Sequence, residues 1–124
     1  MARLFIVGNL VRDPELKQVS TGAILKVTIA ENYKPRQDAA EQVTYVDVTI
    51  WGDLAEHFAA SCHKGQRVFA EGRLKQDNWE DDNGNKRSKL TLNADNAGID
   101  LRFDVASATK PRESSPTQGP EDPF

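Results

Sequence analysis

The sequence predicts a small all-β domain, folded as a five-stranded Greek-key barrel with one short helix. Three observations predict this fold. The 124 residues are the length of one domain. Several segments alternate apolar and polar residues with a period of two, which is typical of half-buried strands. Only one segment, about 53–63, has the period of a helix, and it lies between the third and fourth main strands.

The first predicted strand covers residues 3–11. Its sequence, RLFIVGNLV, is apolar on both parities, so we expect core on one face and another sheet or subunit on the other. Residues 12–22 contain Pro, Ser and Gly and are interpreted as a loop. Residues 23–33 resume a strand, and the alternate apolar residues from Leu25 to Ile29 form its core face.

The third strand, VTYVDVTIWG at 43–52, carries large aromatic residues on the wrong face for a simple barrel. One parity is Thr44, Val46, Val48 and Ile50, which is a core face. The other parity combines Asp47 and Thr49 with Tyr45 and Trp51. The polar segment before it, 34–42, is long for a hairpin loop and is therefore a candidate functional loop.

The helix is predicted from its cap and its apolar stripe. Asp53 is placed to cap the N-terminus, with Glu56 three residues later. Apolar residues recur at i, i+4 and i+8 from Leu54 to Cys62, and Gly65 follows as a stop signal. Cys62 lies on this stripe, which predicts a core residue rather than a reactive thiol.

The remaining strands follow the helix. Residues 67–79 alternate, again with aromatic and basic residues on the parity that does not face the core. Residues 80–87 form a hairpin loop centred on an Asn-Gly pair, a type I′ turn signal. Residues 89–94 return as a strand, and 99–105 alternate as an additional C-terminal strand. This order favours an OB-type barrel, although the pattern alone leaves other small barrels open.

The end of the chain differs in composition from the rest. From about residue 106 it is poor in apolar residues and rich in Pro, Ser and Thr, which is typical of disorder. We therefore expect a folded domain over 1–105 and a disordered tail over 106–124.

Charge and composition exclude several classes. The net charge of −3 provides no global positive field, so an anionic partner requires a local surface. The single cysteine cannot form an intramolecular disulfide, which fits a reducing compartment. No apolar run approaches the roughly 18–20 residues of a membrane span, and the N-terminus shows no signal-peptide h-region, so we expect a soluble, cytoplasmic protein. His57 and His63 have no partners at metal-ligand spacing, so we expect no metal, and we also expect no cofactor.

Aromatic residues on a solvent-facing surface suggest that a binding partner covers them. The pattern does not decide between a protein partner and a nucleic-acid base. The candidates for base stacking are Tyr33, Tyr45, Trp51 and Trp79. The candidates for phosphate contacts are Lys34, Arg36, Arg73, Lys75, Lys86, Arg87 and Lys89. Parity places Tyr33 on the core side, so stacking there requires a bulge after Ile29.

Five motifs, in this order and spacing, resemble the bacterial single-stranded DNA-binding protein family. They are VGNLVRDPEL (7–16), STG (20–22), WGDLAE (51–56), KGQRVFAEGRL (64–74) and WEDDNGNKR (79–87). The resemblance implies an OB-fold, a homotetramer and sequence-independent binding of single-stranded DNA in replication, recombination and repair, at the nucleoid. The four candidate aromatics match the base-stacking positions of the family.

The resemblance extends to the C-terminal tip, Glu121-Asp122-Pro123-Phe124. In the family, an acidic tip ending in Pro-Phe docks replication and repair proteins. The Phe124 side chain can enter an apolar pocket while the acids meet a basic rim. One departure from the family is Asp47, whose charge on the predicted stacking face opposes phosphate. It implies weaker binding or a different salt dependence.

Three other interpretations remain. An OB-fold interaction protein of the primosomal type would use the same face mainly for protein contacts, but the Pro-Phe tip argues against it. An enzyme would need a nucleophile with a base, or a metal-binding carboxylate set, and we find neither in the sequence. An oligosaccharide-binding barrel would also stack aromatics, but it would need neither the basic neighbours nor the acidic tip.

Overall fold

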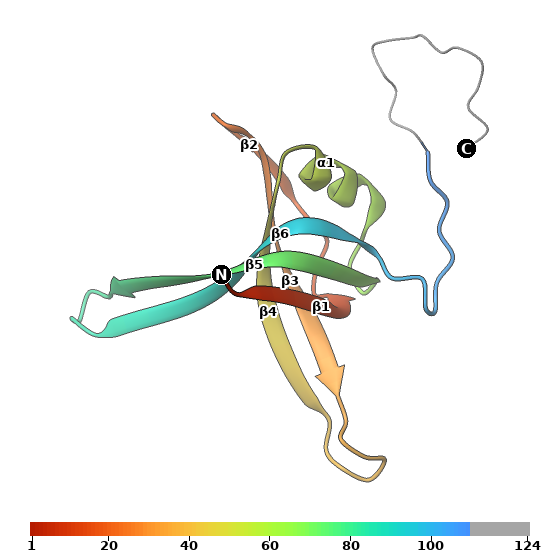
Figure 1. Cartoon of the computed structure of the whole chain (residues 1–124), viewed down its shortest axis with the longest axis horizontal. Helices are drawn as coiled ribbons and strands as arrows, with labels where there is room; N and C mark the ends of the chain where they lie inside the picture. Colours follow the sequence, from red (N-terminus) through yellow and green to blue (C-terminus); the bar gives the residue numbers. More distant parts are fainter. Residues whose placement is uncertain (110–124) are drawn as a thin grey trace.

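The structure is a computed structural model that describes residues 1–109 (Figure 1). These residues form six strands and one helix: β1 (Arg3–Leu10), β2 (Leu16–Val19), β3 (Gly22–Tyr33), β4 (Gln42–Trp51), α1 (Gly52–Ser61), β5 (Arg67–Glu80) and β6 (Lys86–Ile99). The predicted C-terminal tip, and the tail from residue 110 onward, lie outside the described residues.

Five of the strands close into a ring. The sheet order is β1-β5-β6-β4-β3-β2, and β1 also pairs with β3, so that Asn9 lies opposite Ala30. The pairing of β4 with β6 is parallel, and the other pairings are antiparallel. The helix α1 lies between β4 and β5 in the chain. This arrangement confirms the predicted five-stranded Greek-key barrel with one helix.

The core fills the ring from the strand faces that the alternation predicts. Leu25 on β3 lies opposite Ile50 on β4, and both are fully buried. Val68 on β5 and Leu92 on β6 are buried from the other side of the ring. The helix contributes the buried Phe58 and contacts β3, β6 and β4 (Figure 1). Removing such side chains from water is the main favourable term that holds the barrel closed.

The helix begins one residue earlier than predicted and without the predicted cap. Its N-cap is Trp51, in extended conformation and without a side-chain hydrogen bond to the helix. The capping interpretation of Asp53 is therefore wrong. Asp53 lies in the first turn, where its carboxylate is favoured by the positive end of the helix dipole.

Two segments of the chain differ from the sequence-based assignment. The segment assigned to a loop at 12–22 contains β2, whose residues are all exposed and therefore show no apolar period. The additional strand predicted over 99–105 is wrong, because β6 ends at Ile99 and 101–103 form a turn. The Asp100 N–H donates to the Arg67 carbonyl at 3.0 Å, and the two side chains form an ion pair. These contacts hold Asp100 beside the start of β5, and the chain turns immediately after it.

Two hairpins project from the ring (Figure 1). In the β3–β4 hairpin the register runs without a shift from Ile24 opposite Trp51 to Tyr33 opposite Gln42. The bulge predicted between Ile29 and Tyr33 is therefore absent. Tyr33 keeps the parity of the core face and is exposed because this part of the hairpin extends beyond the barrel.

The β5–β6 hairpin closes through a loop built on Asp81. The Gly84 N–H donates to the Asp81 carbonyl, and the Asp81 carboxylate accepts from the N–H groups of Asn83 and Asn85. Gly84 has a φ of 81°, whereas Asn83 does not take a positive φ. The type I′ turn predicted from the Asn-Gly pair requires positive φ at both residues, so that prediction is wrong.

Candidate nucleic-acid interface

One outer face of the barrel crosses four neighbouring strands, and we call it the groove face. A single row of paired residues defines it: Thr28 on β3 faces Asp47 on β4, Asp47 faces Thr91 on β6, and Thr91 faces Lys75 on β5. A hollow of about 490 Å³ lies over this row, and Trp51 lines it. We call this hollow the groove.

The structure brings three of the four candidate aromatics to the groove face. Trp51 is 49% exposed at the end of β4. Tyr45 lies two residues beyond Asp47 on the same face of β4, and Trp79 lies two residues beyond Asp77 on β5. Tyr45 is 66% exposed and Trp79 is 48% exposed. These side chains therefore stand along one surface, each open to a partner.

Tyr33 does not join them. Its register position is on the opposite face of the β3–β4 hairpin from Tyr45, although it is also exposed. Lys34 and Arg36 follow it in the connection between β3 and β4. These three candidates therefore belong to the tip of the hairpin rather than to the groove.

Most of the candidate cations already have carboxylate partners. Four pairs lie within ion-pair distance: Lys89 with Asp47 at 2.9 Å, Arg87 with Asp81 at 2.9 Å, Arg36 with Asp38 at 3.1 Å and Lys75 with Asp77 at 3.6 Å. Among residues 1–109, Lys34, Arg73 and Lys86 have no such partner. The groove is therefore less positive than its lysines alone suggest.

The best-held pair is that of Asp47. Its Oδ1 accepts a hydrogen bond from the Thr28 hydroxyl at 2.8 Å, and its Oδ2 lies 2.9 Å from Lys89 Nζ. The bond to Lys89 lowers the pKa of Asp47, with a further contribution from Thr28, against the opposing effect of burial. The carboxylate is therefore ionised at neutral pH and neutralises the lysine.

Sequence reasoning missed two cations that line the groove, Arg12 and Lys26. Both also line a second hollow of about 420 Å³, together with Lys17 on β2. None of the three has a carboxylate partner within ion-pair distance in the described part of the chain. Lys26 could have been found from the sequence, because it alternates with the core residues of its strand and therefore points outward, opposite Thr49. Arg12 carried no signal, since it lies in the segment assigned to a loop.

A second outer face, over β1 and β5, has a different character, and we call it the Phe face. Phe5 and Phe69 stack there with ring centroids 5.9 Å apart and planes at 16°. Phe5 is 61% exposed, so the cover expected on the outer side of the first strand is not supplied by residues 1–109. Gly98 lies opposite Phe69, where a Cβ would come within 3.1 Å of the ring.

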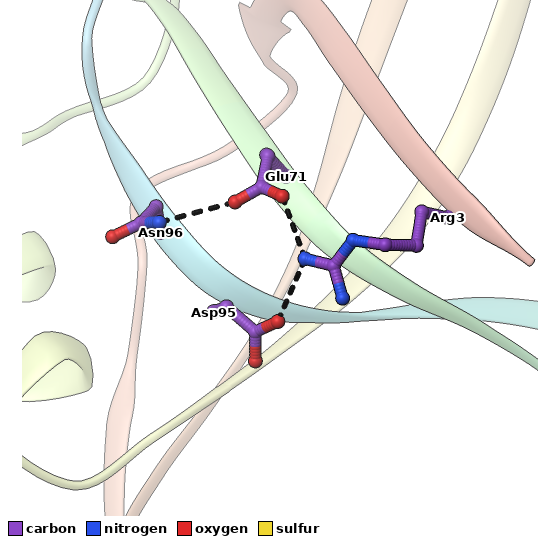
Figure 2. A network of polar contacts seen from close by, with 4 residues as sticks. All are labelled: Arg3, Glu71, Asp95 and Asn96. Atoms are coloured by element: carbon purple, nitrogen blue, oxygen red, sulfur yellow. Dashed lines mark hydrogen bonds and ion pairs between the residues drawn. The ribbon is translucent and has the colours of Figure 1, made fainter. Parts of the chain in front are cut away.

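A polar network lies next to the Phe face, because Glu71 on β5 is opposite Phe5 on β1. Figure 2 shows this network. One guanidinium nitrogen of Arg3 donates to Glu71 at 2.6 Å and to Asp95 at 2.9 Å. Asn96 donates to the other oxygen of Glu71 at 3.1 Å. The bond from Arg3 lowers the pKa of Glu71, so this carboxylate stays charged and paired.

Other reactive chemistry is not visible in the described residues. Within 1–109 no three His, Cys, Asp or Glu side chains gather as metal ligands would. Cys62 is buried, and burial raises its pKa to about 11, so the thiol is protonated at neutral pH. The described chain also contains no helix long and apolar enough to cross a membrane.

The family model and the most similar sequences all belong to single-stranded DNA-binding proteins. The model of the single-strand binding protein family matches residues 1–100. The single-stranded DNA-binding protein of Deinococcus radiodurans is 41% identical, over 76% of this chain and 32% of that protein. That of Bifidobacterium longum is 37% identical, over 85% and 51%. Single-stranded DNA-binding protein 1 of Tropheryma whipplei is 34% identical, over 97% and 68%. Against the first two relatives, the matched region spans only about a third to a half of their length.

Comparison with solved structures supports the fold. The crystal structure of the small single-stranded DNA-binding protein from Streptomyces coelicolor superposes with a TM-score of 0.71. The superposition covers 81% of this chain and 94% of that one, at 22% sequence identity. The two chains therefore share the OB-type barrel, in agreement with the fold predicted from the sequence.

Proposed function

The chain belongs to the single-strand binding protein family, and from this premise we propose that it binds single-stranded DNA, without regard to sequence, through the groove face. The observation that carries the proposal is the row of exposed aromatics on this face. Trp51, Tyr45 and Trp79 stand along one surface with lysines between them. Every base has a π-face, so stacking supplies roughly 1–3 kcal/mol per base without reading sequence.

We propose that the DNA strand passes from the β5–β6 hairpin across the groove and beyond Trp51. Trp79 stands opposite Arg87 at one end of this path. At the other end the two hollows share Arg12 and Lys26, which offer unpaired cations to the phosphates. Lys75 and Lys89 lie between the two ends.

The tip of the β3–β4 hairpin is a separate proposed contact. Tyr33 is exposed on the opposite face of the hairpin from Tyr45, with Lys34 and Arg36 next to it in the chain. DNA that stacks on both tyrosines must pass around the edge of the hairpin. In this proposal the wrapping DNA reaches all four aromatics, and no bulge in β3 is needed.

We further propose that the protein is a homotetramer, with the Phe face among its buried surfaces. An exposed, stacked aromatic pair beside a neutralised polar network is typical of a surface that another subunit covers. Phe5 is 61% exposed, and its ring stacks on Phe69. A second copy of the chain would remove both rings from water.

The tail completes the proposed function. We propose that 1–105 is the DNA-binding domain, and that the tip of the tail 106–124, which lies outside the described residues, recruits replication and repair proteins. The acids Glu121 and Asp122 would meet a basic rim, and Pro123 and Phe124 an apolar pocket. The protein would then protect and organise single-stranded DNA at the nucleoid in the cytoplasm, as a binding protein rather than an enzyme.

One observation favours a second function. Asp47 and Asp77 neutralise the two central lysines of the groove. An OB-fold interaction protein of the primosomal type, which uses this face mainly for protein contacts, would need fewer free cations than a DNA binder. The two functions differ in the ligand of the groove face, which is single-stranded DNA in the first and a protein in the second.

Titration with oligo-dT tests the proposal, with quenching of Trp fluorescence as the readout. Saturable quenching is expected because Trp51 and Trp79 stack bases, and a duplex of equal length should not compete. The logarithm of the affinity should fall with the logarithm of the salt concentration by about 0.7 per phosphate contact. A folded protein without quenching would instead favour the protein-interaction function.

A further inference from the structure

We propose that Asp47 is a built-in competitor for DNA, a fixed carboxylate that occupies the place of a phosphate on Lys89 and competes with the strand for this lysine. The inference rests on the proposed function and names a residue that regulates affinity at the same site. It concerns the centre of the groove, between the two ends of the proposed path.

The carboxylate of Asp47 is held from two sides. Thr28 donates to one oxygen at 2.8 Å, and Lys89 Nζ lies 2.9 Å from the other. Thr28 belongs to β3 and Lys89 to β6, so the acid is fixed by the strands on both sides of β4. The pair is nevertheless open to solvent, since the side chain of Asp47 is 40% exposed and that of Lys89 is 52% exposed.

The other acid in the groove is held less firmly. Lys75 and Asp77 are two residues apart on β5, with 3.6 Å between Nζ and Oδ1. Both side chains are more than half exposed, and within residues 1–109 no hydroxyl group donates to Asp77. Asp77 can swing away from an arriving strand, whereas Thr28 keeps Asp47 in place.

A carboxylate and a phosphate make the same kind of contact with an ammonium group. Both present anionic oxygens, and charge-assisted N–H···O bonds have the same length of about 2.7–2.9 Å for either. A phosphate that binds Lys89 must therefore replace Asp47 or share the lysine with it. In either case the Asp47 carboxylate and the phosphate lie close together and repel each other. The net contribution of Lys89 to the free energy of DNA binding is therefore small.

This exchange has a signature in salt dependence. A free lysine that neutralises a phosphate releases a condensed cation from the DNA, which makes binding salt-dependent. Lys89 is already neutralised by Asp47, so a phosphate at this position gains no net positive partner. The groove should therefore bind more weakly, and with a shallower salt slope, than its lysines alone imply.

The test compares Asp47→Asn with Glu56→Gln in the full chain. Glu56 is exposed on α1, so its replacement makes the same change in net charge away from the groove. Asn keeps the shape of Asp and can still accept from Thr28. We expect Asp47→Asn to raise oligo-dT affinity about three- to tenfold at low salt and to steepen the salt slope by about 0.7, with Glu56→Gln near wild type.

Two further variants make the test specific. Lys89→Ala should lower oligo-dT affinity little in the wild type, where Asp47 already occupies the lysine. In the Asp47→Asn background the same change should lower the affinity several times more, because Lys89 is then free to contact phosphate. Asp47→Thr, with a β-branched residue suited to a strand, should repeat the gain if Asn is poorly tolerated. Thermal melting establishes that each variant is folded.

The outcomes are distinguishable. An affinity of Asp47→Asn equal to that of Glu56→Gln, or lower than wild type, overturns the inference and makes Asp47 a structural partner of Lys89. Binding by the wild type in that case leaves the proposed function intact. Absence of oligo-dT binding by the folded wild type and by every variant overturns the proposed function and this inference together.

Discussion

The groove face and the Phe face are both outer surfaces of one barrel, and both expose aromatic rings. On the groove face the rings of Tyr45, Trp51 and Trp79 stand apart, with cations between them. On the Phe face the two rings stack on each other, and the neighbouring guanidinium is held by two carboxylates. Exposed aromatics alone therefore do not separate the proposed nucleic-acid surface from the Phe face. The separation of the rings distinguishes the groove face, as do Arg12 and Lys26, which have no carboxylate partner within ion-pair distance among residues 1–109.

A β-bulge separates the two regions along β5. The register of β5 with β6 shifts between Glu71 and Gly72, which leaves Asp95 as an extra residue on β6. Gly72 is required there, because a Cβ would come within 2.0 Å of the Asn93 carbonyl oxygen. A bulge bends a strand and increases its twist, and here the extra residue supplies a carboxylate to Arg3. One strand thus serves both faces.

The largest expected effect follows from removing rings from the groove face. The double variant Trp51→Ala, Trp79→Ala should lose roughly 2–6 kcal/mol of binding free energy for an oligo-dT that fits one subunit, because stacking contributes about 1–3 kcal/mol per base. Fluorescence anisotropy of the labelled oligomer measures it. Phe5→Ala is the matched control and should bind this short oligomer as the wild type does. Equal losses in both variants would remove the distinction between the faces.

The next effect concerns the Phe face. Phe5→Ala should weaken self-association by about 1.5–3 kcal/mol per copy, since a buried Phe side chain contributes about that much. Sedimentation at several protein concentrations gives the association constant. Tyr45→Ala, on the groove face, should leave it unchanged. A Phe5→Ala protein that assembles like the wild type would show that subunits meet elsewhere.

A smaller effect is expected from the network of Figure 2. Arg3→Ala should lower the Tm slightly, because Arg3 and Asp95 are exposed, Glu71 is only partly buried, and ion pairs near the surface contribute little. In about 1 M salt, where the screening length falls to about 3 Å, the difference from wild type should disappear. A large loss of Tm that persists in high salt would mean that Arg3 packs rather than pairs.

The smallest effect concerns Cys62, which neither face uses. Burial raises its pKa to about 11, above the ordinary value near 9 that it regains on unfolding. The protonated thiol therefore contributes to stability below pH 9, and this contribution is lost as the pH rises toward 11. At pH 8 the folded protein should resist alkylation and react only when denatured. Rapid labelling of the native protein would contradict this.

Most of the fold was predictable because its strands alternate locally. The parity of Leu25 to Ile29 defines a core face without knowledge of the partner strand. The strand β2 was not predictable, since all of its residues are exposed and carry no period. The hairpin turn was predicted wrongly because the carboxylate of Asp81, rather than the Asn-Gly pair, organises the loop.

The site was predictable within a strand but not between strands. Parity alone places Tyr45, Asp47 and Trp51 together. The ion pair of Asp47 with Lys89 depends on the parallel contact of β4 with β6, which joins segments about 40 residues apart and leaves no local pattern. The membership of Arg12 in the groove depends likewise on the closed ring.

Photocrosslinking of oligo-dT to the wild-type protein, with mapping of the crosslinked residues, tests the central claim most directly. Ultraviolet light joins thymine to aromatic rings in stacking contact, so the crosslinks report which face holds the bases. The account predicts crosslinks at Trp51, Trp79 or Tyr45, and none at Phe5 or Phe69. Crosslinks concentrated on Phe5 and Phe69 would contradict it and make the Phe face the DNA-binding surface.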